Sequence, residues 1–209
     1  TDYMSRFSGV STYATAKTEK TDYMSRFSGV STYATAKTLI QDFQLPVEIE
    51  QLMQQKTDRF LSLLKTELPV PMPGAEALLK TIQNTELTMA LVTGSYRCEI
   101  EPVLENLGWR DFFPLIITRD DVTNAKPHPE PYLKAIECLN LSASECLALE
   151  DSATGIRSAH DAGLTVLAVT TEHTRLTADM GYSALFYSLQ SVGEHVSELL
   201  KEKSGSHGC

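Results

Sequence analysis

Short apolar runs alternate with longer helical periods from residue 86 onward, and this alternation limits the possible folds more than any other feature of the sequence. Four runs have the length and composition of buried strands, and a weaker one follows them: 89–92, 115–118, 146–149, 164–169 and 184–187. Because a helical period lies between successive runs, the strands are expected to pair in parallel, with helices on both faces. The sequence predicts an α/β core over residues 73–202, with a mostly parallel sheet covered on both faces by helices.

A smaller helical part is predicted before this core. Apolar residues recur at helical spacing over 46–66, which indicates an amphipathic helix, and a proline-rich stretch ending at Gly74 interrupts it. We place the junction near 68–74, so that a small all-α domain occupies 21–72. The Ser- and Gly-containing segment 203–209 is expected to be a disordered tail.

The N-terminal region contains a direct repeat, since residues 1–18 recur unchanged at 21–38. Stacked repeat architectures need at least about three units, so two copies do not indicate a solenoid. We interpret 1–20 as a duplicated segment, produced by a recent duplication or by an artefact of the gene record. Only the second copy continues into sequence typical of a folded domain.

Composition narrows the class of protein. The net charge of −9 and the pI near 5.0 would repel a phosphate backbone, which argues against nucleic acid as a partner. No apolar run approaches the ~20 residues of a membrane span, so we expect a cytoplasmic monomer without membrane contact. The four cysteines form no CxxC pair, and Cys98, Cys138 and Cys146 are expected to be small core residues.

Three strand ends carry polar residues, and in an open α/β sheet ligands bind just beyond the carboxyl ends of the strands. The first is Thr93-Gly94-Ser95, after the run 89–92. Its hydroxyl and backbone N–H groups could bind phosphate oxygens. The same residues are also common turn formers, so this segment alone does not distinguish the two roles.

Lys126 lies in the segment KPHPEP, where prolines restrict the backbone and prepare the start of the next helix. A firmly held ammonium group suits the neutralisation of a phosphoryl oxygen, although an ordinary solvated lysine remains the alternative. His128, between two prolines and with no second histidine nearby in sequence, is interpreted as a loop residue.

Glu150 and Asp151 follow the run 146–149 directly. Two adjacent carboxylates repel each other, and Mg²⁺ bound by one or two carboxylates and phosphate oxygens would relieve that repulsion. The alternative is that Asp151 or Ser152 only caps the next helix, which leaves Glu150 unexplained.

Taken together, Thr93, Lys126 in KPHPEPYL, and Glu150-Asp151 in LALEDSATGI resemble the second, third and fourth motifs of the haloacid dehalogenase superfamily. These segments are similar to those of its β-phosphoglucomutase-like and phosphoglycolate phosphatase-like branch, and the similarity spans roughly residues 22–200. The resemblance implies a Rossmann-like, HAD-type three-layer core with a small all-α helical cap, magnesium dependence and phosphoryl transfer through an aspartyl-phosphate.

The same resemblance implies roles for individual residues. Thr93, Gly94 and Ser95 would bind the phosphoryl group, with Lys126 stabilising its charge, and Glu150 and Asp151 would bind Mg²⁺. The segment 26–31 resembles the substrate loop of the cap. Mutases of this branch have an arginine after Gly-Val-Ser, and here Thr32 follows instead, so a phosphatase is favoured over a phosphosugar mutase.

The first motif of the family, an apolar strand ending in Asp-x-Asp-Gly, is not found. Asp2 and Asp22 are each followed by Tyr-Met and lack a preceding strand, so both are rejected as nucleophiles. In the family this strand lies between the strands that end here at Thr93 and Glu150. Its loss would leave the facing edges of those two strands without hydrogen-bond partners. Each buried backbone group without a partner costs about 1–3 kcal/mol.

Two hypotheses of different class follow. The first is a magnesium-dependent phosphohydrolase for a small phosphorylated metabolite, such as a sugar phosphate or a phosphoglycolate-like compound, inactive as given because it lacks the nucleophile. The second is a non-catalytic module or fragment that retains phosphate and Mg²⁺ binding without chemistry.

Overall fold

The computed structural model describes residues 27, 30–170, 174 and 176–205. All strands in this part of the chain pair in parallel: β1 (Ala90–Val92), β2 (Leu115–Ile117), β3 (Leu147–Glu150), β4 (Thr165–Val169) and β5 (Ala184–Phe186). Each overlaps one of the predicted apolar runs, and the parallel pairing confirms the α/β class expected from their alternation with helices.

The sheet is divided between β1 and β3. Within the described residues, β1 pairs with β2, and β3, β4 and β5 form a separate group in that order. No described strand pairs with the remaining edges of β1 and β3. The position predicted for the family's first strand is therefore a break in the hydrogen-bonded ladder of the described chain.

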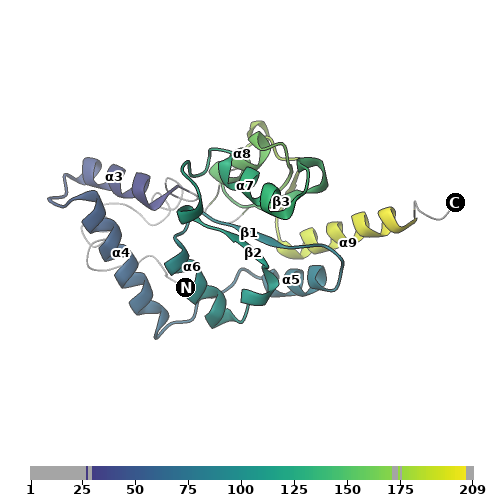
Figure 1. Cartoon of the computed structure of the whole chain (residues 1–209), viewed down its shortest axis with the longest axis horizontal. Helices are drawn as coiled ribbons and strands as arrows, with labels where there is room; N and C mark the ends of the chain where they lie inside the picture. The colour runs from purple at the N-terminus through teal and green to yellow at the C-terminus, as the bar shows by residue number, and fades with distance from the viewer. Residues whose placement is uncertain (1–26, 28–29, 171–173, 175, 206–209) are drawn as a thin grey trace.

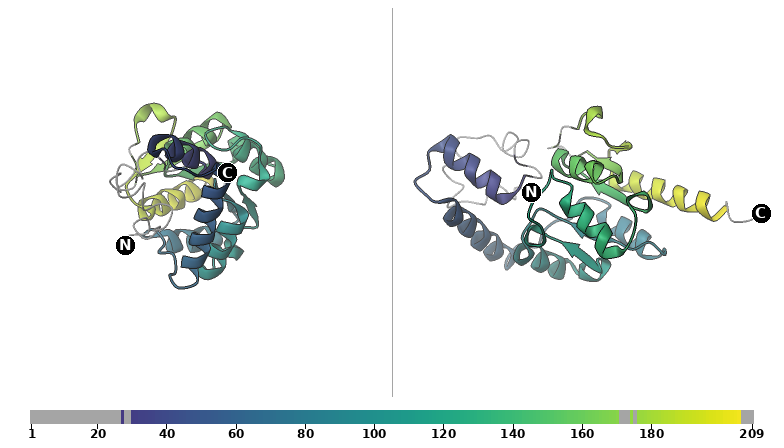
Figure 2. Two further views of the ribbon diagram at one scale, coloured as in Figure 1. Left: turned by 90° about the vertical axis from the view of Figure 1, so that its left-hand side faces the viewer. Right: turned by 45° about the horizontal axis from the view of Figure 1, so that its top comes forward.

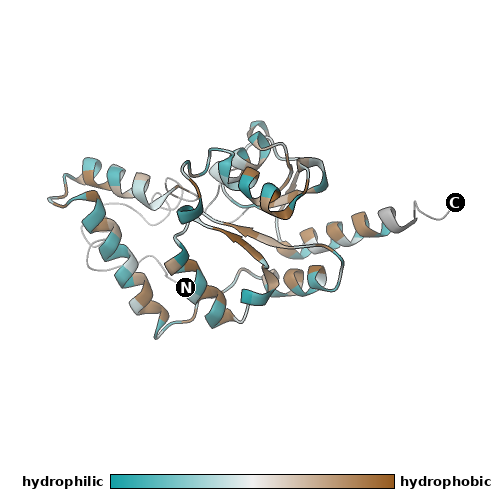
Figure 3. Cartoon of the chain, viewed as in Figure 1, coloured by the Kyte–Doolittle hydropathy of each residue, from teal (hydrophilic) through white to brown (hydrophobic). Residues whose placement is uncertain are grey.

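Helices cover both faces of these strands and give the three layers that were predicted (Figure 1). Their bounds are α5 (Ala75–Gln83), α6 (Arg97–Leu107), α7 (Glu130–Leu139), α8 (Ala153–Asp161) and α9 (Leu189–Gly205). The strands themselves are predominantly apolar, as Figure 3 shows. The alternation of strands and helices thus produces a buried sheet between two helical layers.

Alternate residues of β4 show why both layers are needed. Val166 and Ala168 pack with Ile156 of α8, whereas Leu167 and Val169 pack against α5 and α9. Because successive side chains of a strand point to opposite faces, an apolar run of this kind is stable only when both faces are covered. A third apolar cluster, of Leu104, Phe113 and Ile116, lies between α6 and β2.

The helical part before the core contains α3 (Thr32–Phe43) and α4 (Ile49–Leu64), which lie to one side of the sheet (Figure 2). Ser31 caps α3 by accepting a hydrogen bond from the Ala34 amide at 3.3 Å. The α4 helix is joined to the core by Glu99 of α6, which is buried and accepts hydrogen bonds from Lys56 at 2.8 Å and Thr57 at 2.7 Å.

Several expectations have different outcomes. The α9 helix continues through Gly205, so the first residues of the predicted disordered tail are helical. Residues 206–209 and the first copy of the repeat lie outside the described residues, as do Arg26, Ser28 and Gly29 of the predicted cap loop.

The cysteine prediction was wrong for two positions. Cys98 and Cys138 are exposed on helices, and Cys146 is partly buried. No helix in the described part of the chain is long and apolar enough to cross a membrane.

The face of β3 that points toward the α5 and α9 layer is incompletely covered. Leu149 lies opposite Leu167 in the parallel register, on the same face of the sheet, yet it is 37% exposed whereas Leu167 is 2% exposed. The helical layer therefore covers β4 but leaves the outer part of β3, next to the break, open to solvent.

Two leucine substitutions test this incomplete covering. Leu167→Ala should lower the free energy of unfolding by about 2–5 kcal/mol, the range for buried leucine truncations. Leu149→Ala should cost less than half as much, because much of its side chain already contacts water. Urea unfolding of both variants measures the difference. Equal losses would show that the outer face of β3 is covered in solution.

Candidate active site

The loop after β1 is folded around the hydroxyl group of Thr93. The Thr93 amide donates to the Ile117 carbonyl at 2.9 Å, and the Thr93 hydroxyl accepts from the Ser95 amide at 3.1 Å. A hydroxyl that accepts one hydrogen bond still has its own hydrogen to donate. A Cβ at Gly94 would meet no atom within 4 Å, so the loop is open at this residue and a ligand can approach its backbone.

Lys126 reaches from the segment before α7 to the gap between the two groups of strands. Its side chain is 9% exposed, and its ammonium group donates to the Val92 carbonyl at the end of β1 at 2.9 Å. It also forms an ion pair with Glu150 at the end of β3 and lies 3.5 Å from the Tyr132 hydroxyl. Lys126 therefore connects the carboxyl ends of β1 and β3.

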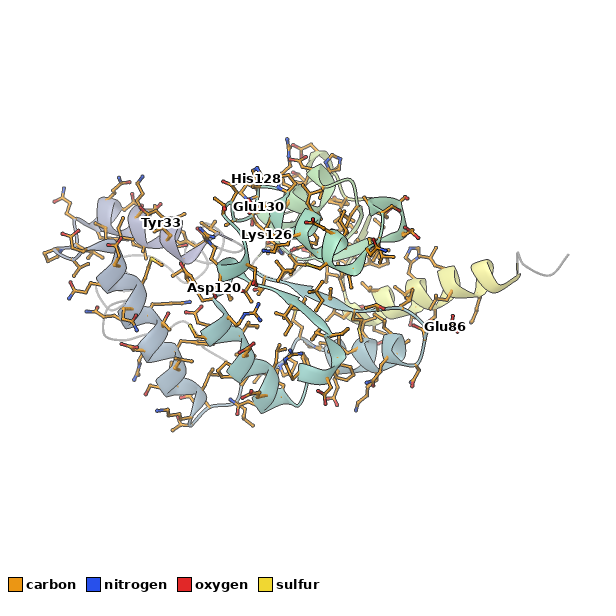
Figure 4. All side chains as sticks on the ribbon, in the orientation of Figure 1. Tyr33, Glu86, Asp120, Lys126, His128 and Glu130 are labelled. Carbon is orange, nitrogen blue, oxygen red and sulfur yellow. The ribbon has the colours of Figure 1, made fainter. Side chains whose placement is uncertain are left out.

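The segment that presents Lys126 is held at several points. Ser158 of α8 donates to the His128 carbonyl at 2.6 Å, and Glu130 accepts from the amides of Thr123 at 2.6 Å and Asn124 at 2.8 Å. Figure 4 shows Lys126, His128 and Glu130 along this segment. His128 is half exposed and contacts Glu130, so its position agrees with the loop role predicted for it.

The Glu150 carboxylate is 8% exposed and is surrounded by protein groups. One oxygen accepts hydrogen bonds from both Lys126 and Tyr132, and the other lies 3.4 Å from the Ser152 hydroxyl. The α8 backbone packs directly against it at Gly155, where a Cβ would overlap the carboxylate. Glu150 thus points into the core on the α7 and α8 side.

Asp151 has the opposite environment, because its side chain is exposed at the rim of the sheet. Ser152, not Asp151, caps α8 by accepting from the Gly155 amide at 3.1 Å. Nearby protein atoms that reduce hydration raise the pKa of the Asp151 carboxyl, and the adjacent Glu150 carboxylate raises it further. Of the two acids, Asp151 has its carboxylate available for a ligand.

These contacts bring the predicted residues to one edge of the sheet. Lys126 touches the backbone of Val92, which precedes Thr93, and the side chain of Glu150, which precedes Asp151. The chain positions of Thr93 and Asp151 therefore lie at the ends of β1 and β3, on either side of the Lys126 ammonium group. Such a set can bind an oxyanion together with a divalent cation.

Sequence reasoning missed two residues of this site. Tyr132 lies in the segment KPHPEPYL but carries no predicted role, and its hydroxyl donates to Glu150. A buried tyrosine hydroxyl usually needs a polar partner, and this requirement was the available signal. Gly155 gave no signal beyond its place in the first turn of α8, yet the Glu150 carboxylate occupies the space of its missing side chain.

The described residues provide no obvious substitute for the nucleophile. Asp121 accepts from the amide and hydroxyl of Thr118 at 2.7 and 2.6 Å and from Arg97 at 2.7 Å. Asp120 accepts from the Arg97 amide at 2.7 Å. Both acids tie the end of β2 to the start of α6, and Asp2 and Asp22 lie outside the described residues.

The fold is therefore a three-layer α/β core with a parallel sheet, a lysine and two acids at the carboxyl ends of its strands, and a helical part before it. The family model described as "Haloacid dehalogenase-like hydrolase" matches residues 5–169. The chain belongs to this family, as the resemblance of its three motifs implied.

Curated relatives and a solved structure agree with this membership. The chain is 32% identical to the Bacillus subtilis protein named "Putative phosphatase YhcW", over 75% of this chain and 69% of that protein. It is 31% identical to the phosphoglycolate phosphatase of Salmonella typhimurium, over 58% of this chain and 49% of the enzyme. The chain thus spans between about half and about two thirds of these relatives.

The fold is similar to that of CbbY from Rhodobacter sphaeroides, a structure determined in complex with phosphate. The TM-score is 0.76 at 24% identity, and the match covers 84% of this chain and 80% of CbbY. At this identity the likeness establishes the fold, which is the three-layer core expected from the sequence.

Gly155 offers a direct test of the packing around Glu150. In Gly155→Ala the new methyl group would overlap the Glu150 carboxylate and force it from its buried contacts with Lys126 and Tyr132. We expect a loss of about 3 kcal/mol or more in urea unfolding, because overpacking and disruption of a buried ion pair act together.

The matched control is Gly193→Ala in α9, where the nearest atom to the new Cβ would be Leu78 Cδ1 at an ordinary 3.6 Å. This change should leave the chain as stable as before or slightly more stable, because alanine favours the helix. A Gly155→Ala variant as stable as the control would contradict the packing described for Glu150.

Proposed function

We propose that this chain carries the phosphate- and magnesium-binding part of a phosphohydrolase that acts on a small phosphorylated metabolite. Sugar phosphates and phosphoglycolate-like compounds are the substrate class that fits best. The single observation that carries the proposal is the position of Lys126, whose ammonium group joins the strand end before Thr93 to the strand end before Asp151.

The loop of Thr93, Gly94 and Ser95 would bind the phosphoryl oxygens. The Thr93 hydroxyl has a hydrogen to donate, and the space beside Gly94 leaves its backbone accessible. Lys126 would supply positive charge from the opposite side of the same edge. Preorganised donors of this kind stabilise the charge that develops during phosphoryl transfer, since they need little reorganisation.

The donor chemistry of the site fits Mg²⁺. This ion prefers oxygen ligands and is usually held by one or two carboxylates together with water and substrate phosphate oxygens. Asp151 would be the direct carboxylate ligand, with Glu150 beside it. Bound Mg²⁺ would neutralise phosphate charge, and its proximity would also relieve the repulsion between the two acids. No group of three or more potential His, Cys, Asp or Glu ligands occurs among the described residues.

The proposal includes inactivity of this chain by itself. An aspartyl-phosphate route requires a nucleophilic carboxylate and a second acid that transfers the proton, and neither is identified near Lys126. The break between β1 and β3 lies next to the ammonium group, so a strand entering there would deliver carboxylates directly to it. The names of the relatives support a phosphatase, and the substrate is proposed from their class.

A phosphate-release assay tests the catalytic part. The chain as given should release no phosphate from a panel of sugar phosphates and phosphoglycolate with Mg²⁺ present. Fusion of an apolar strand ending in Asp-x-Asp-Gly before Thr1 should restore turnover, whereas the same fusion with Asn in place of the first Asp should not. Robust turnover by the unfused chain would refute the proposal that this chain has no nucleophilic aspartate.

Titration calorimetry tests the metal part in the same chain. Asp151→Asn should weaken Mg²⁺ binding at least about tenfold in the presence of inorganic phosphate, because it removes the charged ligand. The control is Glu137→Gln, which removes one exposed carboxylate on α7 away from the site. Equal Mg²⁺ affinity in the wild-type chain and both variants would exclude Asp151 as a ligand.

A further inference from the structure

We propose that Tyr132 is a positioning residue of this site, which fixes the Lys126 ammonium group by holding both Lys126 and its partner Glu150. The inference rests on the proposed function, because it concerns how that site presents its positive charge. Tyr132 is not proposed to contact the phosphate or the Mg²⁺, and it would act only through Lys126 and Glu150.

The contacts form a closed triangle of side chains. The Tyr132 hydroxyl donates to the same Glu150 oxygen that pairs with Lys126, and its oxygen lies 3.5 Å from Lys126 Nζ. The ammonium group also lies 4.9 Å from the centre of the Tyr132 ring, within the range of a cation–π contact. Each member of the triangle therefore restricts the other two.

Burial of the three side chains raises the free-energy cost of losing any of these contacts. Tyr132 is 6% exposed, and the side chains of Lys126 and Glu150 are 9% and 8% exposed. A buried carboxylate that loses a hydrogen-bond donor has little water to replace it.

A second reading is that Tyr132 only fills space. Its ring packs in the apolar cluster with Ala148, Ile156 and Val166, and a phenylalanine would fill the same volume. The two readings differ in what happens to Lys126 when the hydroxyl alone is removed. A packing role predicts no specific change at that lysine, whereas a positioning role predicts that its ammonium group is released.

The experiment measures the rate at which individual lysines of the whole chain are reductively methylated, by mass spectrometry, in the wild type and in Tyr132→Phe. Lys126 should be methylated about tenfold faster in the variant, the factor expected when a hydrogen bond within a charged network is lost. Lys134 is an internal control on the same helix, where its ammonium group donates to the Asp121 carbonyl.

The outcomes separate the two readings. Faster methylation of Lys126 with an unchanged rate at Lys134 supports positioning. Equal acceleration of both lysines would indicate general loosening of α7 and overturn the inference, as would unchanged rates at both. Tyr187→Phe, which removes a hydroxyl from an 81% exposed tyrosine, should leave the rate at Lys126 unchanged.

Inorganic phosphate binding, followed by calorimetry, separates this inference from the proposed function. If the wild-type chain binds phosphate, Tyr132→Phe should weaken that binding about tenfold through the same loss. Failure of the wild-type chain to bind phosphate would instead refute the proposed function, and the methylation rates would still decide whether Tyr132 positions Lys126.

A measurement on the wild-type chain covers the case in which Tyr132→Phe does not fold. The Tyr132 hydroxyl proton, held in a buried hydrogen bond to a carboxylate, should exchange slowly with water and give a separate downfield proton resonance. That resonance should be absent from the chain unfolded in urea, where the hydroxyl proton exchanges rapidly with water. Its absence from the folded wild-type chain would overturn the inference.

Discussion

The buried ion pair between Lys126 and Glu150 is the contact on which the rest of the site depends, because it crosses the break between two groups of strands. No described strand pairing joins β1 to β3. Lys126 connects their carboxyl ends instead, through its hydrogen bond to the Val92 carbonyl and its ion pair with Glu150. Desolvation makes a buried ion pair a weak source of net stability, but loss of one partner leaves a charge without compensation. The pair therefore fixes geometry more than it adds stability.

The backbone of β1 explains why Lys126 is held so firmly. Successive residues of a strand direct their N–H and C=O groups to alternate edges, and the Thr93 amide bonds to β2, so the Val92 carbonyl faces the broken edge. Lys126 satisfies this carbonyl. With Glu150 and Tyr132 it has partners for all three of its hydrogens. A strand paired at that edge would satisfy Val92 itself and would leave Lys126 a hydrogen for a phosphoryl oxygen.

Patterns of apolar residues predicted the described strands and most helices of the core, because burial on one or both faces requires a regular spacing of side chains. They predicted less where a contact joins distant segments. The contact between Lys126 and Val92 spans 34 residues and involves a backbone carbonyl, which no residue type reveals. The direction of the Tyr132 hydroxyl likewise depends on how α7 packs beside α8 and the strands, which the residue type does not reveal. Helix α3 lies across the end of the repeat, where duplicated sequence obscured the pattern.

The neighbouring acids show how backbone geometry separates residues that look equivalent in sequence. Glu150 is the last residue of β3, and its side chain follows Ala148 to the face covered by α7 and α8. Asp151 follows where the strand ends, and because Ser152 takes the cap of α8, its carboxylate remains at the open rim. Adjacent carboxylates therefore have different environments: one is neutralised inside the protein, while the other is left with the charge that a cation would compensate. The repulsion that suggested a shared metal ion from the sequence is thus already partly relieved by Lys126, and a proposed Mg²⁺ would act mainly on Asp151.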